Sequence, residues 1–206
     1  MAANYNNSAW FYDTLSRLVY GSALVKAQVY LLQFIPPNAN ILIVGGGTGW
    51  ILNEITKIRP SGLQITYVEI AAKMMSLSKK RDTGLNQVVF INDAIENVGF
   101  EAPFDVVITP FLFDNFTEQT FKQVFNHIHL LLKNGGLWFN CDFQLKGKWW
   151  QKVLLRLMFL FFRIVCNIEA FKLPDIESQF GLSGYLIKEK QTFFGGFIVS
   201  QVYSNA

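Results

Sequence analysis

The stretch ILIVGGGTGW, residues 41–50, places four apolar residues directly before a loop in which four of five residues are glycine. The apolar run predicts a buried strand, and the helical spacing of Ile51, Leu52 and Ile55 predicts a helix after the loop. Glycine adopts positive φ and lets a ligand approach the backbone closely. Because helix N-termini favour negative groups, the loop is predicted to hold a small, partly anionic ligand at the carboxyl end of the strand.

Strands and helices continue to alternate up to about residue 143. Apolar, β-branched runs predict strands in LQITYVEI, NQVVFIND, FDVVITPF and LWFNCDF, and helical spacing predicts helices in AAKMMSLSKKR and NFTEQTFKQVFNHIHLLLK, the latter stopped by NGG. This alternation predicts an α/β fold with a largely parallel sheet covered on both faces. Residues 184–190 and 195–204 predict an antiparallel pair of strands that closes the sheet.

The chain of 206 residues suits a single domain. We expect an N-terminal helical lid over residues 1–37, broken near Gly21, a cofactor-binding core over 38–143, a helical insert over 144–175 and a strand pair over 176–206. The net charge of +3, without a dense basic run, gives no reason to expect nucleic acid as a partner.

Two cysteines outside any CxxC pattern, and no histidine cluster beside them, argue against a disulfide framework and against a metal site. The first ten residues lack the pattern of a signal peptide. The longest apolar stretch, 153–166, has 14 residues and two arginines, which is too short for a membrane-spanning helix. We therefore expect a cytoplasmic protein.

The glycine loop fits neither the dinucleotide fingerprint GxGxxG nor the Walker loop. It fits the spacing GxGxG, through Gly45, Gly47 and Gly49. Glu69 ends the second predicted strand, where a carboxylate can accept hydrogen bonds from both ribose hydroxyls of a nucleoside. The third strand ends at Asp93 and Ala94, where an adenine could lie with its amino group donating to Asp93.

These motifs, in this order, resemble those of class I S-adenosylmethionine-dependent methyltransferases. The resemblance covers residues 38–143 and rests on VGGGTG, Glu69, the following AAKMM, NDA, and LLKNGG before the fifth strand. It implies a Rossmann-like seven-stranded sheet with an antiparallel last strand, and S-adenosylmethionine as cofactor. It also implies roles for individual residues: the methionine moiety near Gly45, Gly47 and Gly49, the ribose at Glu69, the adenine at Asp93, Ala94 and Met74, and the sulfonium near Thr109 to Phe111.

Two of these positions have an alternative interpretation. Met74 equally fits packing of its own helix. The segment WFYDTLSRLVYG resembles the N-terminal helix of the quinone-biosynthesis methyltransferases, which would place Tyr12 over the cofactor, although Tyr12 could equally pack within the lid.

Methyl transfer from a sulfonium is an in-line displacement, so holding the nucleophile in line is most of the task. A general base is needed only when the methyl acceptor must lose a proton early. The candidates for a catalytic role are Asp114, Asp142 and Tyr12. Asp114 could instead simply precede a helix whose N-cap and partner would be Asn115 and Glu118, and Asp142 could be structural.

The two histidines, His127 and His129, lie on the long predicted helix and are not expected to be catalytic. His129 shares its face with Lys122, Asn126 and Lys133, so we expect it to be solvated.

Residues 148–168 predict a helix that is apolar except for one stripe, formed by Lys152, Arg156, Arg163 and Asn167. Such a wide apolar surface needs cover, which could come from its own domain, from a second copy in a homodimer, or from peripheral contact with a membrane.

The sequence therefore predicts methyl transfer from S-adenosylmethionine to a small-molecule methyl acceptor of hydrophobic character. Two other functions fit the same fold. One is aminopropyl transfer, and the other is a non-catalytic protein that binds a nucleoside or acts as a scaffold.

Overall fold

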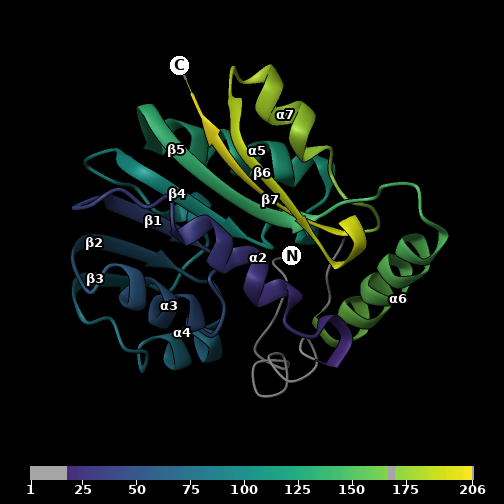
Figure 1. The fold of residues 1–206 in the computed structure, drawn as a ribbon, viewed down its shortest axis with the longest axis horizontal. Coiled ribbons are helices and arrows are strands. Elements are labelled where there is room, and N and C mark those ends of the chain that lie inside the picture. The colour runs from purple at the N-terminus through teal and green to yellow at the C-terminus, as the bar shows by residue number, and fades with distance from the viewer. Residues whose placement is uncertain (1–17, 167–169, 206) are drawn as a thin grey trace.

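The computed structural model describes residues 18–166 and 170–205. Its centre is a seven-stranded sheet in the order β3-β2-β1-β4-β5-β7-β6 (Figure 1). The first five strands are parallel to one another, and β7 runs antiparallel to both β5 and β6. The bounds are Asn40–Val44 (β1), Ser61–Val68 (β2), Leu85–Ile91 (β3), Phe104–Pro110 (β4), Leu132–Phe143 (β5), Leu186–Phe193 (β6) and Ile198–Ser204 (β7). The predicted Rossmann-like α/β fold is confirmed.

Helices cover both faces of the sheet. The α-helices are Ala23–Leu32 (α2), Trp50–Ile58 (α3), Ala72–Ser78 (α4), Glu118–Leu131 (α5), Trp149–Cys166 (α6) and Ile176–Leu182 (α7). The described residues also form short 3-10 helices at Ile95–Asn97 (η2), Phe113–Asn115 (η3) and Phe194–Gly196 (η4). Figure 1 shows α2 and α3 in front of the sheet, with α5 behind it.

The alternation of side chains along β1 divides the apolar core into two layers. Ile41 and Ile43 belong to the core beneath α2 and α3, while Leu42 and Val44 belong to the core beneath α5 and α7. All four are essentially buried. Successive residues of a strand point to opposite faces, so a continuous apolar run is what a strand covered on both sides requires.

Helix α5 begins two residues later than the expected cap allows. Its N-cap is Thr117, whose hydroxyl accepts a hydrogen bond from the backbone N–H of Thr120 at 3.3 Å. The expected cap, Asn115, is wrong, because Asn115 ends η3 and its side-chain amide donates to the carbonyls of Phe111 and Leu112 just before η3. Both residue types cap helices well, and the turn at η3 decides between them.

Two further local expectations are wrong. Asn134-Gly135-Gly136 was expected to separate α5 from the next strand, but β5 already begins at Leu132 and passes through this segment, with a shift in its register to β4. His129 was expected in solvent, but its Nδ1 lies 2.9 Å from the hydroxyl of Tyr185, and the residue is half-buried.

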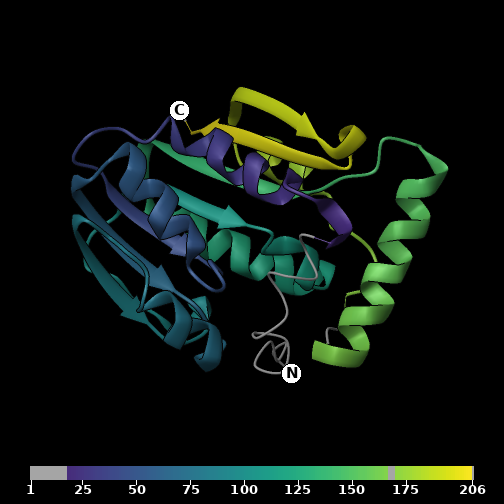
Figure 2. The same ribbon diagram turned by 60° about the horizontal axis from the view of Figure 1, so that its bottom comes forward.

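The long helix α6 lies at one end of the molecule, outside the sheet (Figure 2). Part of its surface is core, because Leu155, Met158, Phe159 and Cys166 are buried. The sequence left three candidates to cover the apolar surface of this helix: its own domain, a second copy or a membrane. Its own domain covers one side of it. Within residues 18–166 and 170–205, no helix is long and apolar enough to cross a membrane.

Candidate active site

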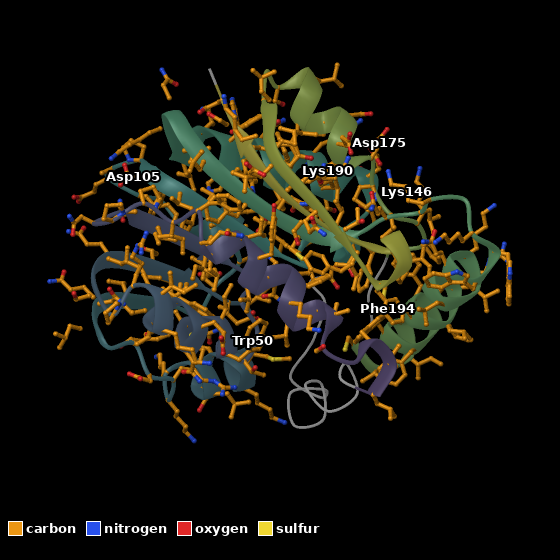
Figure 3. All side chains as sticks on the ribbon, in the orientation of Figure 1. Trp50, Asp105, Lys146, Asp175, Lys190 and Phe194 are labelled. Atoms are coloured by element: carbon orange, nitrogen blue, oxygen red, sulfur yellow. The ribbon has the colours of Figure 1, made fainter. Side chains whose placement is uncertain are left out.

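A cavity of about 710 Å³ lies at the carboxyl ends of β1, β2 and β4 and extends towards α6. One end is lined by the glycine loop, Glu69 and Asp93, and the other by aromatic and aliphatic side chains. Trp50, the first residue of α3, also lines it and is labelled in Figure 3. This is the edge of an open parallel sheet where ligands bind.

Gly47 is the glycine of the loop whose missing side chain leaves open space. Its φ is +63°, and no atom lies within 4 Å of the position that a Cβ would occupy. A ligand can therefore approach its backbone directly. The other glycines of the loop serve packing, since a Cβ would lie 2.9 Å from Leu112 at Gly45 and 2.5 Å from the Tyr67 ring at Gly46.

Gly49 differs from its predicted role. It precedes α3 with a φ of +75°, and a Cβ there would lie 2.5 Å from the Cβ of Ser78 in α4. It does not line the cavity, although Gly45, Gly46, Gly47 and Thr48 do. Gly49 thus allows α3 and α4 to pack closely, which a spacing rule cannot distinguish from contact with a ligand.

The loop is held in place by two side chains from outside it. The hydroxyl of Tyr67 donates to the carbonyl of Gly47 at 3.0 Å, and Nε of Arg81 donates to the carbonyl of Thr48 at 2.8 Å. With both carbonyls engaged, the loop is fixed before any ligand arrives, which lowers the entropic cost of binding.

Glu69 is almost fully buried at the end of β2 and lines the cavity. Its two carboxylate oxygens accept hydrogen bonds from the backbone N–H groups of Gly47 at 3.0 Å and Ala71 at 2.8 Å. Burial raises the pKa of Glu69, and these backbone donors oppose that rise. Each carboxylate oxygen can accept a further hydrogen bond, so the group can still receive the two hydroxyls of a ribose.

The end of β3 supplies the next part of the lining. Asp93, Ala94 and Met74 all line the cavity beside Glu69. One oxygen of Asp93 accepts from the N–H of Ala94 at 2.7 Å and from the amide of Asn97 at 2.8 Å, which fixes the carboxylate. Met74 is buried against Ala71 while also facing the cavity, so both of its predicted roles fit its position.

Thr109 was predicted to lie near the sulfonium of the cofactor, and this prediction is wrong because Thr109 does not line the cavity. Its side chain is completely buried, and its hydroxyl accepts from the indole N–H of Trp138 at 2.9 Å and lies 3.0 Å from the side-chain oxygen of Asn140. The cavity is lined instead by the residues that follow it, Pro110, Phe111 and Leu112. Phe111 has a φ of +51°, which is uncommon for a residue other than glycine and marks strained backbone at this edge.

Asp114 and Asp142 form a buried pair of carboxyl groups. Asp114 lines the cavity, whereas Asp142 is fully buried behind it and accepts from the N–H groups of Phe113 at 3.2 Å and Phe143 at 2.8 Å. Burial raises the pKa of Asp142 to about 7. Burial and the charge of Asp142 raise the pKa of Asp114 well above its usual value. Because backbone donors favour the charged form of Asp142, Asp114 is the member that stays protonated.

The far end of the cavity is an apolar wall that the sequence did not single out. Tyr20 comes from the N-terminal region, Phe143 from β5, and Met158 and Phe161 from α6. The Tyr20 hydroxyl points at the sulfur of Met158 at 3.4 Å, and its ring lies 5.5 Å from that of Phe143. Tyr12, the remaining predicted site residue, lies outside the described residues.

The two histidines do not line the cavity. His127 lies 3.3 Å from the carbonyl of Val98, and His129 contacts Tyr185 as described above. In the described part of the chain, no group of three or more His, Cys, Asp or Glu side chains is arranged to hold a metal ion.

Comparison with known proteins identifies the core of the chain. The family model described as "Methyltransferase domain" matches residues 41–136, which contain the glycine loop, Glu69 and Asp93. This segment is a methyltransferase domain. S-adenosylmethionine is its cofactor, the molecule that solved structures of the same fold hold as SAM or as its product SAH. No curated protein matches the chain.

Solved structures place this methyltransferase in the same fold. Magnesium protoporphyrin IX methyltransferase from Synechocystis PCC 6803, with bound SAH, is 16% identical, with a TM-score of 0.65 over 89% of this chain and 82% of that one. The DhpI–SAH complex is 12% identical, with a TM-score of 0.68 over 98% and 93%. Mitomycin 7-O-methyltransferase MmcR is 13% identical, with a TM-score of 0.68 over 90% of this chain, which spans 55% of its length.

Proposed function

We propose that this methyltransferase transfers the methyl group of S-adenosylmethionine to the oxygen or nitrogen of a small molecule with a hydrophobic body. The observation that carries the proposal is the division of one cavity into two chemically different ends. Hydrogen-bonding groups from Gly47, Glu69 and Asp93 suit a nucleoside with a charged amino-acid tail. The wall formed by Tyr20, Phe143, Met158 and Phe161 suits an apolar molecule.

The cofactor fits the polar end residue by residue. The methionine moiety would lie against Gly47, where the backbone is open, with Gly45 beside it in the lining, and the ribose hydroxyls would donate to Glu69. The adenine would lie beside Ala94 and Met74, with its amino group towards Asp93. This arrangement turns the sulfonium towards Phe111 and the apolar wall.

The reaction then needs little beyond alignment. A lone pair of the methyl acceptor attacks the methyl carbon, the carbon–sulfur bond breaks, and its electron pair stays on sulfur as the neutral thioether of S-adenosylhomocysteine. The methyl acceptor's proton leaves to solvent. Holding the nucleophile within reach of the methyl carbon accounts for most of the acceleration.

Asp114 is suited to position the nucleophile. It is the polar side chain of the buried pair that reaches the cavity, and it is held neutral. The carbonyl oxygen of a neutral carboxyl group can accept a hydrogen bond from a hydroxyl or amino group and leave that group's lone pair free to attack. We assign Asp114 as a positioning residue and Asp142 as the charged group that keeps it protonated.

The hydrophobic methyl acceptor has a second, independent support. The segment WFYDTLSRLVYG resembles the N-terminal helix of quinone-biosynthesis methyltransferases, which act on hydrophobic rings, although most of this segment lies outside the described residues. A membrane-soluble phenol or quinol is thus the methyl acceptor class that we favour.

The test is a methyl-transfer assay with labelled S-adenosylmethionine and a panel of phenols, quinols and amines graded from polar to apolar. We expect labelled product to increase with the hydrophobicity of the methyl acceptor. We also expect Asp114→Ala to lower kcat by about tenfold and Asp114→Asn, which keeps a carbonyl oxygen, to restore most of it. Binding of S-adenosylhomocysteine without product from any methyl acceptor would contradict the proposal. Turnover of decarboxylated S-adenosylmethionine alone would assign aminopropyl transfer instead.

A further inference from the structure

Helix α6 exposes a face that the rest of the described chain leaves uncovered. We define the outer face of α6 by its exposed residues: Trp149, Lys152, Val153, Arg156, Leu157, Leu160, Arg163 and Ile164. They recur at steps of three and four, so they lie along one side of the helix. Trp149 is 76% and Ile164 is 77% exposed, which is unusual for large apolar side chains gathered on one surface.

The opposite side of α6 is anchored, so the outer face cannot turn inward. Trp150 packs edge-on against Phe194 at 5.8 Å and contacts Phe197 at 5.9 Å. Phe194, labelled in Figure 3, belongs to η4 beside the start of α6. Gln151 is buried and accepts a hydrogen bond from the N–H of Lys146 at 2.8 Å, and the Tyr20 hydroxyl reaches Met158.

The charged residues of α6 itself are all basic. Residues 143–168 contain five Lys and Arg residues and neither Asp nor Glu. Lys152, Arg156 and Arg163 are exposed among the apolar residues of the outer face. Arg163 lies 4.6 Å from the ring centre of Phe171, which is itself 69% exposed, so one exposed aromatic side chain beyond the helix adjoins the outer face.

The basic charge of α6 distinguishes between the two remaining candidates to cover its outer face, a second copy of the chain and a membrane surface. A second copy docked face to face would bring basic residues of both helices together with no acidic residue on either helix to compensate. An anionic lipid surface satisfies both components, because phosphate groups pair with Lys and Arg while Trp, Leu and Ile enter the boundary between headgroups and acyl chains.

We propose that the outer face of α6 docks the protein on the surface of anionic phospholipid membranes. Leu157 is 58% exposed on this face and also lines the cavity, as do Leu154 and Phe161 of the same helix. The apolar end of the cavity is therefore next to the docking surface. Resting on the proposed function, this position would let a hydrophobic methyl acceptor pass from the bilayer into the cavity.

The experiment is co-sedimentation of the full chain with vesicles of phosphatidylcholine alone and of phosphatidylcholine mixed with phosphatidylglycerol, at low and high salt. We expect binding only to the anionic vesicles, weakened by salt. Lys152→Gln with Arg156→Gln, and separately Ile164→Glu, should each lower the partition coefficient by about tenfold or more. The matched control is Leu182→Glu, which places the same charge at an 85% exposed leucine of α7 and should bind like the parent.

Folding and cofactor binding are followed separately in every variant, by circular dichroism and by titration with S-adenosylhomocysteine. Anionic-vesicle binding by a parent that does not bind S-adenosylhomocysteine would retain the docking surface and contradict the proposed function. No binding of a folded parent to anionic vesicles would overturn the docking proposal. So would equal binding by Ile164→Glu and Leu182→Glu, or self-association that Ile164→Glu abolishes while vesicle binding is unaffected.

Discussion

Gly47 is the residue of the glycine loop at which the backbone is open to the cavity, and we expect the cofactor to contact it there. Gly47→Ala is expected to weaken binding of S-adenosylhomocysteine by about tenfold or more, because the new methyl group enters the space left for the ligand. The measurement is the rise in Tm produced by a fixed concentration of S-adenosylhomocysteine. Gly184→Ala is the control, since Gly184 has a φ of +80° with no atom near its Cβ position. An equal ligand-induced rise in both variants would contradict this role.

The carboxylate of Glu69 is bonded to the glycine loop and also lines the cavity, where we propose that it binds the ribose. Glu69→Gln replaces an oxygen by an amide N–H₂ that must face the N–H of Gly47 or of Ala71. We expect the free energy of unfolding to fall by about 1–3 kcal/mol and S-adenosylhomocysteine affinity to fall as well. Glu54→Gln, which removes only an ion pair with exposed Lys57, should change stability by less than about 1 kcal/mol. Equal denaturation midpoints for the two variants would count against the link.

The buried pair gives stability a pH dependence with a defined sign. Asp142 has a pKa of about 7 in the folded protein, and that of Asp114 is well above normal. Between the unfolded value of about 4 and these raised values, the folded state binds more protons than the unfolded state, so stability falls as pH rises. We expect Tm to be higher at about pH 5 than at about pH 8, and Asp114→Asn to flatten this difference. An unchanged slope in Asp114→Asn would contradict the pairing.

At the level of secondary-structure elements, strand β2 supports the glycine loop through the side chain of Tyr67. Tyr67→Phe keeps the ring that packs under Gly46 and removes the hydrogen bond to the carbonyl of Gly47. We expect a loss of about 0.5–1.5 kcal/mol in the free energy of unfolding, measured by urea denaturation. Gly46→Ala, which would force a Cβ to 2.5 Å from the same ring, should cost more. The reverse order would show that the hydroxyl, and not the close packing, holds the loop.

The parallel strands could be predicted from the sequence, because a strand that is buried on both faces has a continuous run of apolar residues. The ends of these strands were harder to predict, because they depend on contacts with residues that are distant in the sequence. Thr109 and Phe111 illustrate this difficulty: both follow the apolar part of β4, but alternation turns the Thr109 side chain into the core against Trp138, while the strained turn brings Phe111 to the cavity. Thr117 replaced Asn115 as the cap of α5 for a similar reason, because η3 occupies Asn115.

At the scale of the whole molecule, the polar end of the site was predictable and the apolar end was not. Gly45, Gly47, Glu69 and Asp93 follow strands that the sequence reveals, and strand ends meet at one edge of a parallel sheet. Tyr20, Phe143 and Met158 come from three distant parts of the chain. Phe143 and Met158 belong to no motif, and in the segment WFYDTLSRLVYG the predicted site residue was Tyr12, not Tyr20. A helix with apolar residues around most of its circumference does not reveal which side faces its own domain, and in α6 the anchoring of Trp150 and Gln151 decides it.

We expect the polar end of this cavity to bind the cofactor of the methyltransferase. Isothermal titration of the full chain with S-adenosylhomocysteine tests it most directly, beside a folded Glu69→Ala variant. We expect saturable binding at one site, with a dissociation constant of about micromolar size, and loss of this binding in the variant. A folded parent that releases no binding heat and shows no ligand-induced rise in Tm would contradict cofactor binding at this end of the cavity.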